Sequence, residues 1–321
     1  MSLLISFQRK VNFMSEKNIT QKTKEFYEQY HFPGDRPIDQ DGLIFLRKFS
    51  KAVEKINSTK NNVRVLDAGC GTGNTSISLA AQFKDIEFLG LDNSSSSLDE
   101  AKFNAKKKGL TNMKFRRWNL LKPMPSKSKY DIVLCLGVLH HTGNMEKVLI
   151  NLNKKLDDSG VMFLWIYGKH GRYRHSLNMR LLKMLLELKP EPENKIDLAM
   201  EFATKTEQGL PLIDLIGKMK TDEMQMNAFK SPVWIADQFL NPHEILINME
   251  ELLQLTRRTG FKISHILGVE ENISKKFFSE KLSERFLRLS KNKQLIAADL
   301  LLKPERYFVM LEKLRAGRRK K

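Results

Sequence analysis

The sequence predicts an α/β protein in which helices cover both faces of a doubly wound, mostly parallel sheet of seven strands. Two observations predict this fold. From residue 63 onward, short β-branched or apolar runs alternate with segments of helical spacing. The first of these runs also leads directly into a glycine-rich turn, as a strand before a helix commonly does. An N-terminal helical segment and helical insertions are expected to complete the fold.

The strands are expected where short apolar runs end in glycine or polar residues. Residues 63–68 form the first strand, because Val63, Val65 and Leu66 lead into Gly69. Helical spacing of apolar residues places helices between most of the strands. The other strands are expected at 86–91, 113–117, 130–136, 161–167, 261–269 and 306–311, and the helices at 75–83, 95–108, 144–156 and 249–259.

Composition along the chain divides it into five segments. Prolines interrupt the helical spacing after residue 168, and no convincing strand follows for about ninety residues, which predicts a lid-like insertion. Residues 1–13 precede a more polar start at Met14 and are expected to be an upstream extension with no role in the fold. The segments are an N-terminal helical cap (1–60), an α/β core (61–168), a helical lid insertion (169–248), a completion of the core (249–312) with its own helical insertion (273–302), and a basic tail (313–321).

Overall composition excludes several classes of protein. With 41% hydrophobic and 29% charged residues, the 321-residue chain is neither a disordered polyelectrolyte nor a membrane bundle. Its longest apolar runs, 132–139 and 161–167, are much shorter than the roughly 18 residues that a membrane-spanning helix needs. Only two cysteines are present, Cys70 and Cys135, so a disulfide scaffold is excluded and a reducing, cytoplasmic setting is expected.

The charge favours an anionic partner without identifying it. Lys and Arg total 55 against 37 Asp and Glu, which gives a net charge of +18. Residues 101–130 contain ten basic side chains and no acidic one, and the tail 315–321 is also basic. These runs are either solvated surface or a site for RNA or an anionic membrane.

The glycine turn and a following carboxylate predict a nucleoside site. Gly69, Gly71 and Gly73 expose bare backbone at the end of a strand, next to the amides that begin a helix. Asn74 stands where a dinucleotide site would have its third glycine, which argues against a nicotinamide or flavin cofactor. Asp92 ends the second strand, where a carboxylate can accept hydrogen bonds from both ribose hydroxyls. Together these features predict an adenosine-containing ligand.

These residues also carry a family resemblance. The segment 65–73 (VLDAGCGTG), with Asp92 and the segment 130–142 (YDIVLCLGVLHHT), resembles the class I S-adenosylmethionine-dependent methyltransferases. Within them it is most similar to the methyltransferase-domain group that includes ubiquinone-biosynthesis-type enzymes. The resemblance covers residues 60–168 strongly and 245–312 more loosely. It implies S-adenosylmethionine as cofactor and a Rossmann-like seven-stranded sheet whose last strand is antiparallel.

The resemblance implies that the glycine turn holds the methionine part of the cofactor. Gly69, Gly71 and Gly73 would lie against it, and Asp67 would order the loop. An aspartate in such a turn is about equally expected to cap its own loop and to contact the ligand.

The resemblance also implies residues for the nucleoside. Asp92 would take the ribose hydroxyls, Asn93 would lie beside the adenine, and Leu136 would line the opposite side. Asn119 occupies a position where the family more often has an aspartate that contacts the adenine amino group. An asparagine oxygen can still accept that bond, but without the strengthening charge.

Two histidines follow the fourth strand at the same edge of the sheet. His140 and His141 are candidate bases that could remove a proton from a hydroxyl or amine acceptor. Alternatively, one ring packs on the cofactor and the other orders the loop. No histidine spacing typical of a metal site occurs, so no metal is expected.

Two further segments are candidates for contacts with the ligands. Arg172, Tyr173 and His175 lie at the entrance of the insertion and suit a carboxylate or phosphate on the acceptor, or else form an ordinary surface turn. The aromatic residues within 26–32 either close over the cofactor or pack between helices.

These observations predict a methyltransferase that acts on a small-molecule or lipid-like acceptor. An RNA or protein methyltransferase is the alternative that the basic segments suggest. A protein that binds the cofactor without catalysis is a second alternative. The tetrapeptide that accompanies methylation of a flipped base is absent after the fourth strand, which argues against that reaction.

Overall fold

The computed structural model describes residues 15–32, 40–60, 62–125, 127–187, 195–205, 231–267 and 278–314. Its centre is a seven-stranded sheet with the order β3-β2-β1-β4-β5-β7-β6. β7 runs antiparallel to β5 and β6, and the remaining pairs are parallel, so the predicted fold class is confirmed. The strands are β1 (Arg64–Ala68), β2 (Glu87–Asp92), β3 (Met113–Arg117), β4 (Tyr130–Leu136), β5 (Leu156–Tyr167), β6 (Phe261–Leu267) and β7 (Arg306–Lys313).

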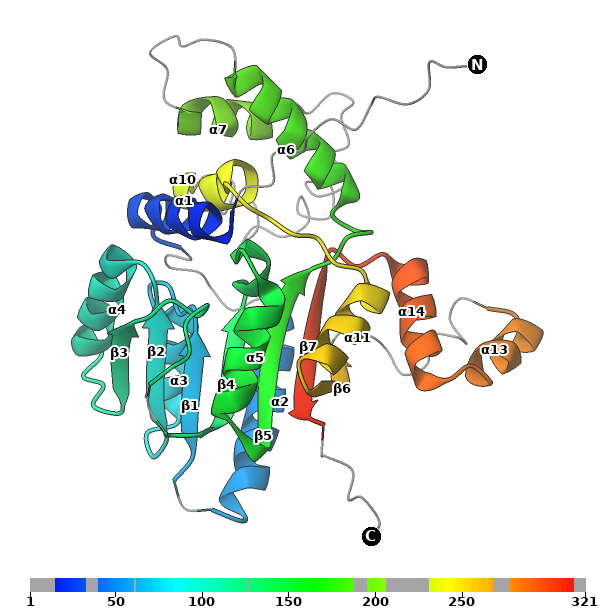
Figure 1. The fold of residues 1–321 in the computed structure, drawn as a ribbon, viewed down its shortest axis with the longest axis horizontal. Coiled ribbons are helices and arrows are strands. Elements are labelled where there is room, and N and C mark those ends of the chain that lie inside the picture. Colours follow the sequence, from blue (N-terminus) through cyan, green and yellow to red (C-terminus); the bar gives the residue numbers. More distant parts are fainter. Residues whose placement is uncertain are drawn as a thin grey trace.

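Helices cover both faces of this sheet (Figure 1). Those of the core alternate with the strands, as expected. Three further helices, α6, α7 and α10, lie beyond the carboxyl ends of the strands. The described helices are α1 (Glu16–Gln29), α2 (Gln40–Asn57), α3 (Asn74–Gln82), α4 (Ser95–Lys107), α5 (Met145–Lys155), α6 (Tyr173–Leu186), α7 (Lys195–Lys205), α10 (Pro232–Ile235), α11 (Met249–Arg258), α13 (Glu280–Leu287) and α14 (Lys291–Leu302), with short turns η1 (Leu139–His141) and η2 (Ala236–Leu240).

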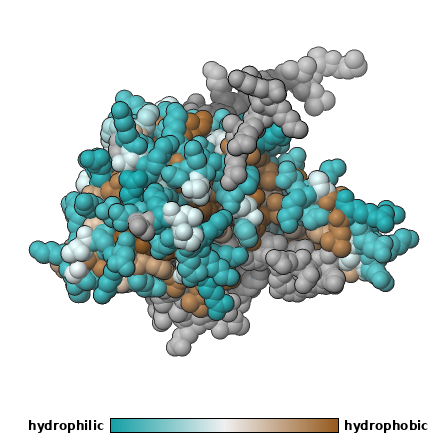
Figure 2. All heavy atoms as spheres, turned by 90° about the horizontal axis from the view of Figure 1, so that it is seen from below, coloured by the Kyte–Doolittle hydropathy of each residue, from teal (hydrophilic) through white to brown (hydrophobic). Residues whose placement is uncertain are grey.

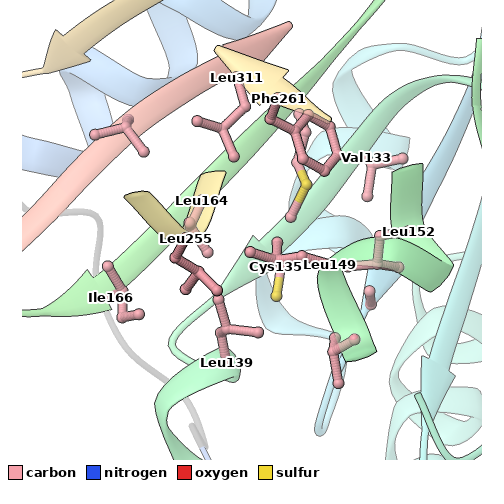
Figure 3. Close-up of a cluster of buried hydrophobic side chains, with 14 of the residues drawn as sticks. Val133, Cys135, Leu139, Leu149, Leu152, Leu164, Ile166, Leu255, Phe261 and Leu311 are labelled. Carbon is pink, nitrogen blue, oxygen red and sulfur yellow. The ribbon is translucent and has the colours of Figure 1, made fainter. Parts of the chain in front are cut away.

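The central strands bury side chains on both faces, which explains why they read as continuous apolar runs. Leu66, Val133 and Leu164 belong to a cluster that includes residues of α5 and α11. Part of this cluster, with Val133 and Leu164 among the labelled side chains, is shown in Figure 3. Their sequence neighbours Val65 and Phe163 face the opposite side and belong to a cluster with residues of α2 and α3. Successive residues of a strand therefore supply both cores, which fixes the register of the sheet.

Local hydrogen bonds explain where the helices begin. Asn248 accepts a hydrogen bond from the backbone N–H of Glu251, and the Glu251 carboxylate accepts one from the N–H of Asn248. This reciprocal pair satisfies two amides that would otherwise lack partners at the start of α11. Asn144 plays the simpler capping role at α5, where its side chain accepts from the N–H of Lys147.

Some element boundaries differ from the expectation. β5 begins at Leu156 instead of residue 161, because Leu156 pairs with Tyr130 across an irregularity in the β4–β5 ladder. The helical insertion expected at 273–302 contains two helices, α13 and α14, separated at residues 288–290. The expected extension 1–13 and the tail beyond residue 314 lie outside the described residues.

The insertion after β5 has a small core of its own. Leu182, Phe202 and Phe239 pack there with Phe26 of α1 and with Tyr30, the residue that follows this helix, so the N-terminal helix and the insertion share one apolar cluster. Figure 1 shows this layer above the carboxyl edge of the sheet. The opposite end of the molecule, seen in Figure 2, is mainly hydrophilic with scattered hydrophobic residues. None of the described helices is both long enough and apolar enough to cross a membrane.

Candidate functional site

A cavity opens at the carboxyl ends of β1, β2 and β4. This is where the strand order reverses direction between β1 and β4, the position at which open α/β sheets bind ligands. Its empty volume, which includes open solvent at the mouth, is about 1110 Å³. Its walls are formed by Thr20, Thr23, Lys24, Tyr27, Phe32, Asp67, Gly69, Cys70, Gly71, Thr75, Asp92, Asn93, Ser94, Ser97, Trp118, Asn119, Leu120, Leu121, Leu136, Gly137, Val138, His141 and Thr142.

The glycine turn forms one wall of this cavity. Gly69 and Gly71 line it, and both have the positive φ angles that favour glycine, 86° and 53°. A Cβ atom on Gly69 would lie 2.4 Å from Val138 Cγ2, so the close approach excludes any side chain. Gly73 does not line the cavity. It begins α3 at φ 78°, and a Cβ atom there would lie 2.9 Å from Ile77.

Asp92 ties this turn to the end of β2. Its Oδ2 accepts a hydrogen bond of 2.9 Å from the N–H of Gly71, and its Oδ1 accepts one of 2.9 Å from the N–H of Ser94. Burial raises the pKa of the carboxyl group, although these backbone bonds oppose the shift. A carboxylate has about four acceptor positions, so the backbone bonds leave capacity to accept from a ribose hydroxyl. The residues present therefore fit an adenosine-containing cofactor.

Asp67 lies at the end of β1 and also lines the cavity. Burial raises the pKa of its carboxyl group to about 7, a hydrogen bond from Ser76 lowers it, and the nearby Asp92 raises it further. A carboxylate desolvated in this way favours a cationic ligand, because a positive charge offsets the cost of burying the negative one. The methionine part of S-adenosylmethionine carries such charges.

The other residues predicted for the nucleoside are also in the cavity wall. Asn93, Asn119 and Leu136 all line it. Asn119 Oδ1 accepts a hydrogen bond of 2.9 Å from the N–H of Leu121, so the side chain orders its own loop. This oxygen has a second lone pair with which it can also accept a bond from an adenine amino group. Trp118, beside it, adds an aromatic surface to the cavity.

The two histidines after β4 have different surroundings. His141 lines the cavity, and its Nδ1 lies 2.8 Å from the carbonyl oxygen of His243. His140 is completely buried outside the cavity wall, where its ring stacks on Tyr167 with 4.0 Å between the centroids. Burial, followed by the charges of His141 and Arg172, lowers the pKa of His140 well below its usual value. The structure thus separates two side chains that the sequence could not distinguish.

The residues predicted to bind an anionic acceptor do not line the cavity. Arg172 is buried and forms an ion pair of 3.1 Å with Glu244, and its guanidinium lies 3.5 Å from the centroid of the Tyr167 ring. His175 is also buried, with Nε2 2.8 Å from the carbonyl oxygen of Gln238. Tyr173 is exposed at the start of α6.

A buried polar network connects Arg172 to the cavity. Arg172 donates to the side-chain oxygen of Gln238, whose amide donates to Asp237. Asp237 accepts a hydrogen bond of 2.8 Å from the hydroxyl of Tyr27, which lines the cavity. Asp237 and Gln238 lie in the π-helical turn η2, a type of turn that is frequent at functional sites. The sequence analysis did not identify these two residues, because no local motif marks a π-helical turn.

The N-terminal helix α1 is held over the cavity by its last turn. Glu28 accepts hydrogen bonds from the backbone N–H groups of Ser95 and Ser96 at the start of α4. Burial raises the pKa of Glu28, but the bonds from Ser96 and Ser95 outweigh this and lower it to about 2. Tyr27 and Phe32 line the cavity, and Phe32 also packs, with Phe26 and Tyr30, against the core of the insertion.

The comparisons with known proteins agree with this geometry. Residues 59–205 match a family model described as a methyltransferase domain. The matched residues, with the sheet order described above, are identified as a class I S-adenosylmethionine-dependent methyltransferase domain. S-adenosylmethionine is the cofactor of this domain, and the cavity lies at the position where open α/β sheets bind ligands.

Individual relatives of the methyltransferase are distant. An uncharacterized protein of Synechococcus is 23% identical over 283 residues, which cover 85% of this chain and 67% of the relative. The ubiquinone biosynthesis O-methyltransferase of Rickettsia canadensis is 29% identical over 115 residues, 35% of this chain and 47% of the relative. The structure of PKMT2 from Rickettsia typhi in complex with AdoHcy has a TM-score of 0.62 at 15% identity, with 78% of this chain and 49% of that one covered. The chain thus spans about half the length of the last two proteins.

Proposed function

We propose that this methyltransferase transfers the methyl group of S-adenosylmethionine to a hydroxyl group on a small-molecule or lipid-like acceptor. When bound, the cofactor would supply a methyl group on a positively charged sulfur. The acceptor oxygen would bond to the methyl carbon from the side opposite the sulfur, and the carbon–sulfur bond would break. The observation that carries the proposal is the position of His141 in the wall of the cavity that also contains Asp67 and Asp92. The O-methyltransferases of ubiquinone biosynthesis among the relatives support a hydroxyl acceptor.

His141 has the tautomer that a base needs. A carbonyl oxygen can only accept a hydrogen bond, so the contact with His243 places the proton of the neutral ring on Nδ1. The lone pair is then on Nε2, where it can accept a proton from an acceptor hydroxyl during methyl transfer. His140 is not proposed as the base, because it is buried outside the cavity wall and its pKa is low.

Tyr27 and the apolar wall are proposed to position the acceptor. The Tyr27 hydroxyl has a fixed direction, since it donates to Asp237 and accepts from Asn241 Nδ2 at 3.0 Å.

The ten cations of residues 101–130 are all exposed, and three of them lie on β3 at the edge of the sheet. Charged side chains on an edge strand oppose pairing with another sheet, so their presence does not require a nucleic acid.

Labelled cofactor tests the proposal. The full chain is incubated with a cell extract and S-adenosylmethionine labelled in its methyl group, and the label is followed into small-molecule, lipid, protein and RNA fractions. We expect label in an organic-soluble or low-mass product. His141→Ala is expected to reduce turnover by about 10² to 10⁴ while calorimetric binding of S-adenosylhomocysteine changes little.

Matched controls separate catalysis from folding. His265→Ala removes an exposed histidine on the edge strand β6 and should leave turnover unchanged. Label in RNA or protein alone would contradict the proposed acceptor class, and cofactor binding without any labelled product would support the non-catalytic alternative. Full turnover by His141→Ala would remove this residue as the base.

A further inference from the structure

Helix α6 carries a stripe of exposed apolar side chains. The exposed fractions are 61% for Tyr173, 46% for Leu177, 36% for Leu181, 60% for Met184 and 49% for Leu185. Their spacing of three and four residues places them on one side of the helix. A large apolar surface of this kind is unusual on a protein that stays free in water and marks an interaction site.

The opposite side of α6 is anchored in the protein. His175, Asn178 and Leu182 are buried there. The His175 ring lies 5.0 Å from that of Phe239, and its Nε2 contacts the backbone of η2. Because these contacts fix the rotation of the helix, the apolar stripe cannot turn inward. It faces away from the described core of the insertion.

The charge of α6 selects the kind of partner. The 14 residues of the helix contain no Asp or Glu, whereas Arg174, Arg180 and Lys183 are all exposed. Two copies of this surface would bring like charges together, which opposes self-association. Leucines combined with arginine and lysine on one short helix are typical of a helix that lies in the interface of an anionic membrane.

We propose that α6 docks on the surface of an anionic lipid bilayer, with its apolar stripe in the interface and its cations among the lipid headgroups. Figure 1 shows α6 in the layer above the carboxyl edge of the sheet, and the cavity opens at that same edge. Its buried face contacts η2, which supplies Asp237 to Tyr27 in the cavity wall. Docking would therefore bring the cavity near a lipid-like acceptor, an inference that rests on the proposed function.

Vesicle sedimentation of the full chain tests the docking surface. We expect binding to vesicles of phosphatidylcholine with phosphatidylglycerol, weaker binding to phosphatidylcholine alone, and a loss of affinity with added salt. The double variant Leu177→Ser with Leu181→Ser should bind anionic vesicles about tenfold more weakly or worse. Arg180→Gln with Lys183→Gln should lose about fivefold for each charge removed.

A matched control removes exposed apolar side chains elsewhere. Leu43 on α2 is 50% exposed and Phe103 on α4 is 66% exposed, so Leu43→Ser with Phe103→Ser should leave vesicle binding unchanged. Equal loss in this control and the α6 variants would overturn the proposal, as would absence of vesicle binding by the unaltered chain. RNA can also compete with the vesicles for the cations of the protein. If RNA abolishes vesicle binding, and the α6 serine variant still binds vesicles, the cations of the chain would be assigned to nucleic acid instead of lipid.

Two further measurements distinguish other occupants of the stripe. A marked fall in melting temperature for the α6 serine variant would show that another part of the chain covers the stripe, and loss of a dimer in light scattering would show a second copy there. Either result would overturn membrane docking. Calorimetric cofactor binding should be the same for all variants, and its absence in the unaltered chain would refute the proposed function separately from the docking surface.

Discussion

The hydroxyl group of Tyr27 donates a hydrogen bond of 2.8 Å to the carboxylate of Asp237, which lies 210 residues further along the chain. The bond joins the N-terminal helix α1, whose Tyr27 lines the cavity, to the π-helical turn η2. Burial and then the charge of Asp237 raise the pKa of Tyr27 well above its usual value, so the hydroxyl stays protonated and can donate. Two segments outside the α/β core are thus fastened together across the site.

Tyr27→Phe should weaken this connection. Asp237 would lose a donor while remaining buried, which we expect to lower the free energy of unfolding by about 1 to 3 kcal/mol. Denaturant titration measures this change. Tyr173→Phe removes the hydroxyl of an exposed tyrosine and serves as the control. If both variants unfold at the same denaturant concentration as the unaltered chain, the bond contributes nothing to stability.

Asp92→Ala should weaken cofactor binding by about 1 to 3 kcal/mol through the loss of charge-assisted hydrogen bonds. The glycine turn would also lose the acceptor that holds the N–H of Gly71. Isothermal calorimetry with S-adenosylhomocysteine measures the effect. Asp99→Ala is the control, since that carboxylate is on the exposed face of α4 and pairs with Lys102. An unchanged affinity for Asp92→Ala would contradict its assigned role.

The stability of the cofactor-free protein should depend on pH through Asp67. Its pKa is about 7 in the folded protein, above the ordinary aspartate value of 3.8, so the folded state holds the proton more tightly than the unfolded chain. The free energy of unfolding therefore falls as the pH rises from about 4 to about 7. Asp67→Asn should make this fall smaller in denaturant titrations at a series of pH values. The same slope in both proteins would exclude Asp67 as a source.

Gly69→Ala should be more harmful than Gly109→Ala. Both glycines have positive φ angles, 86° and 65°, so each substitution should cost about 1 kcal/mol of backbone strain. A Cβ atom on Gly69 would also collide with Val138, whereas nothing lies within 4 Å of one on Gly109. We expect an additional loss of about 1 to 3 kcal/mol for Gly69→Ala from overpacking. Equal unfolding free energies for the two variants would contradict the close approach.

The nucleoside half of the site could be predicted because its signals are local. Gly69, Gly71 and Asp92 stand at the ends of strands that are visible as apolar runs, and parallel strands bring their carboxyl ends to one edge. The cavity places all three in its wall. Gly73 belongs to the same motif, but it lies against Ile77 of α3 instead of lining the cavity. Which way each glycine faces depends on the direction of the backbone within the turn.

The acceptor half could not be predicted, because it is built from distant segments. Asp237 and Asn241 meet Tyr27 only when the insertion folds back onto α1, and Arg172 is turned inward toward Glu244 by the same packing. Arg172, which the sequence analysis placed at the entrance of the insertion, is thus part of a buried ion pair with Glu244.

By itself, the sequence determined the sheet and the glycine turn at its carboxyl edge, since periodicity and glycine placement act between near neighbours along the chain. Only the tertiary structure decided which histidine faces the cavity. His140 and His141 are adjacent in the chain, and the carbonyl of His243 orients one ring while Tyr167 covers the other. Contacts between residues so far apart leave no pattern in a single sequence.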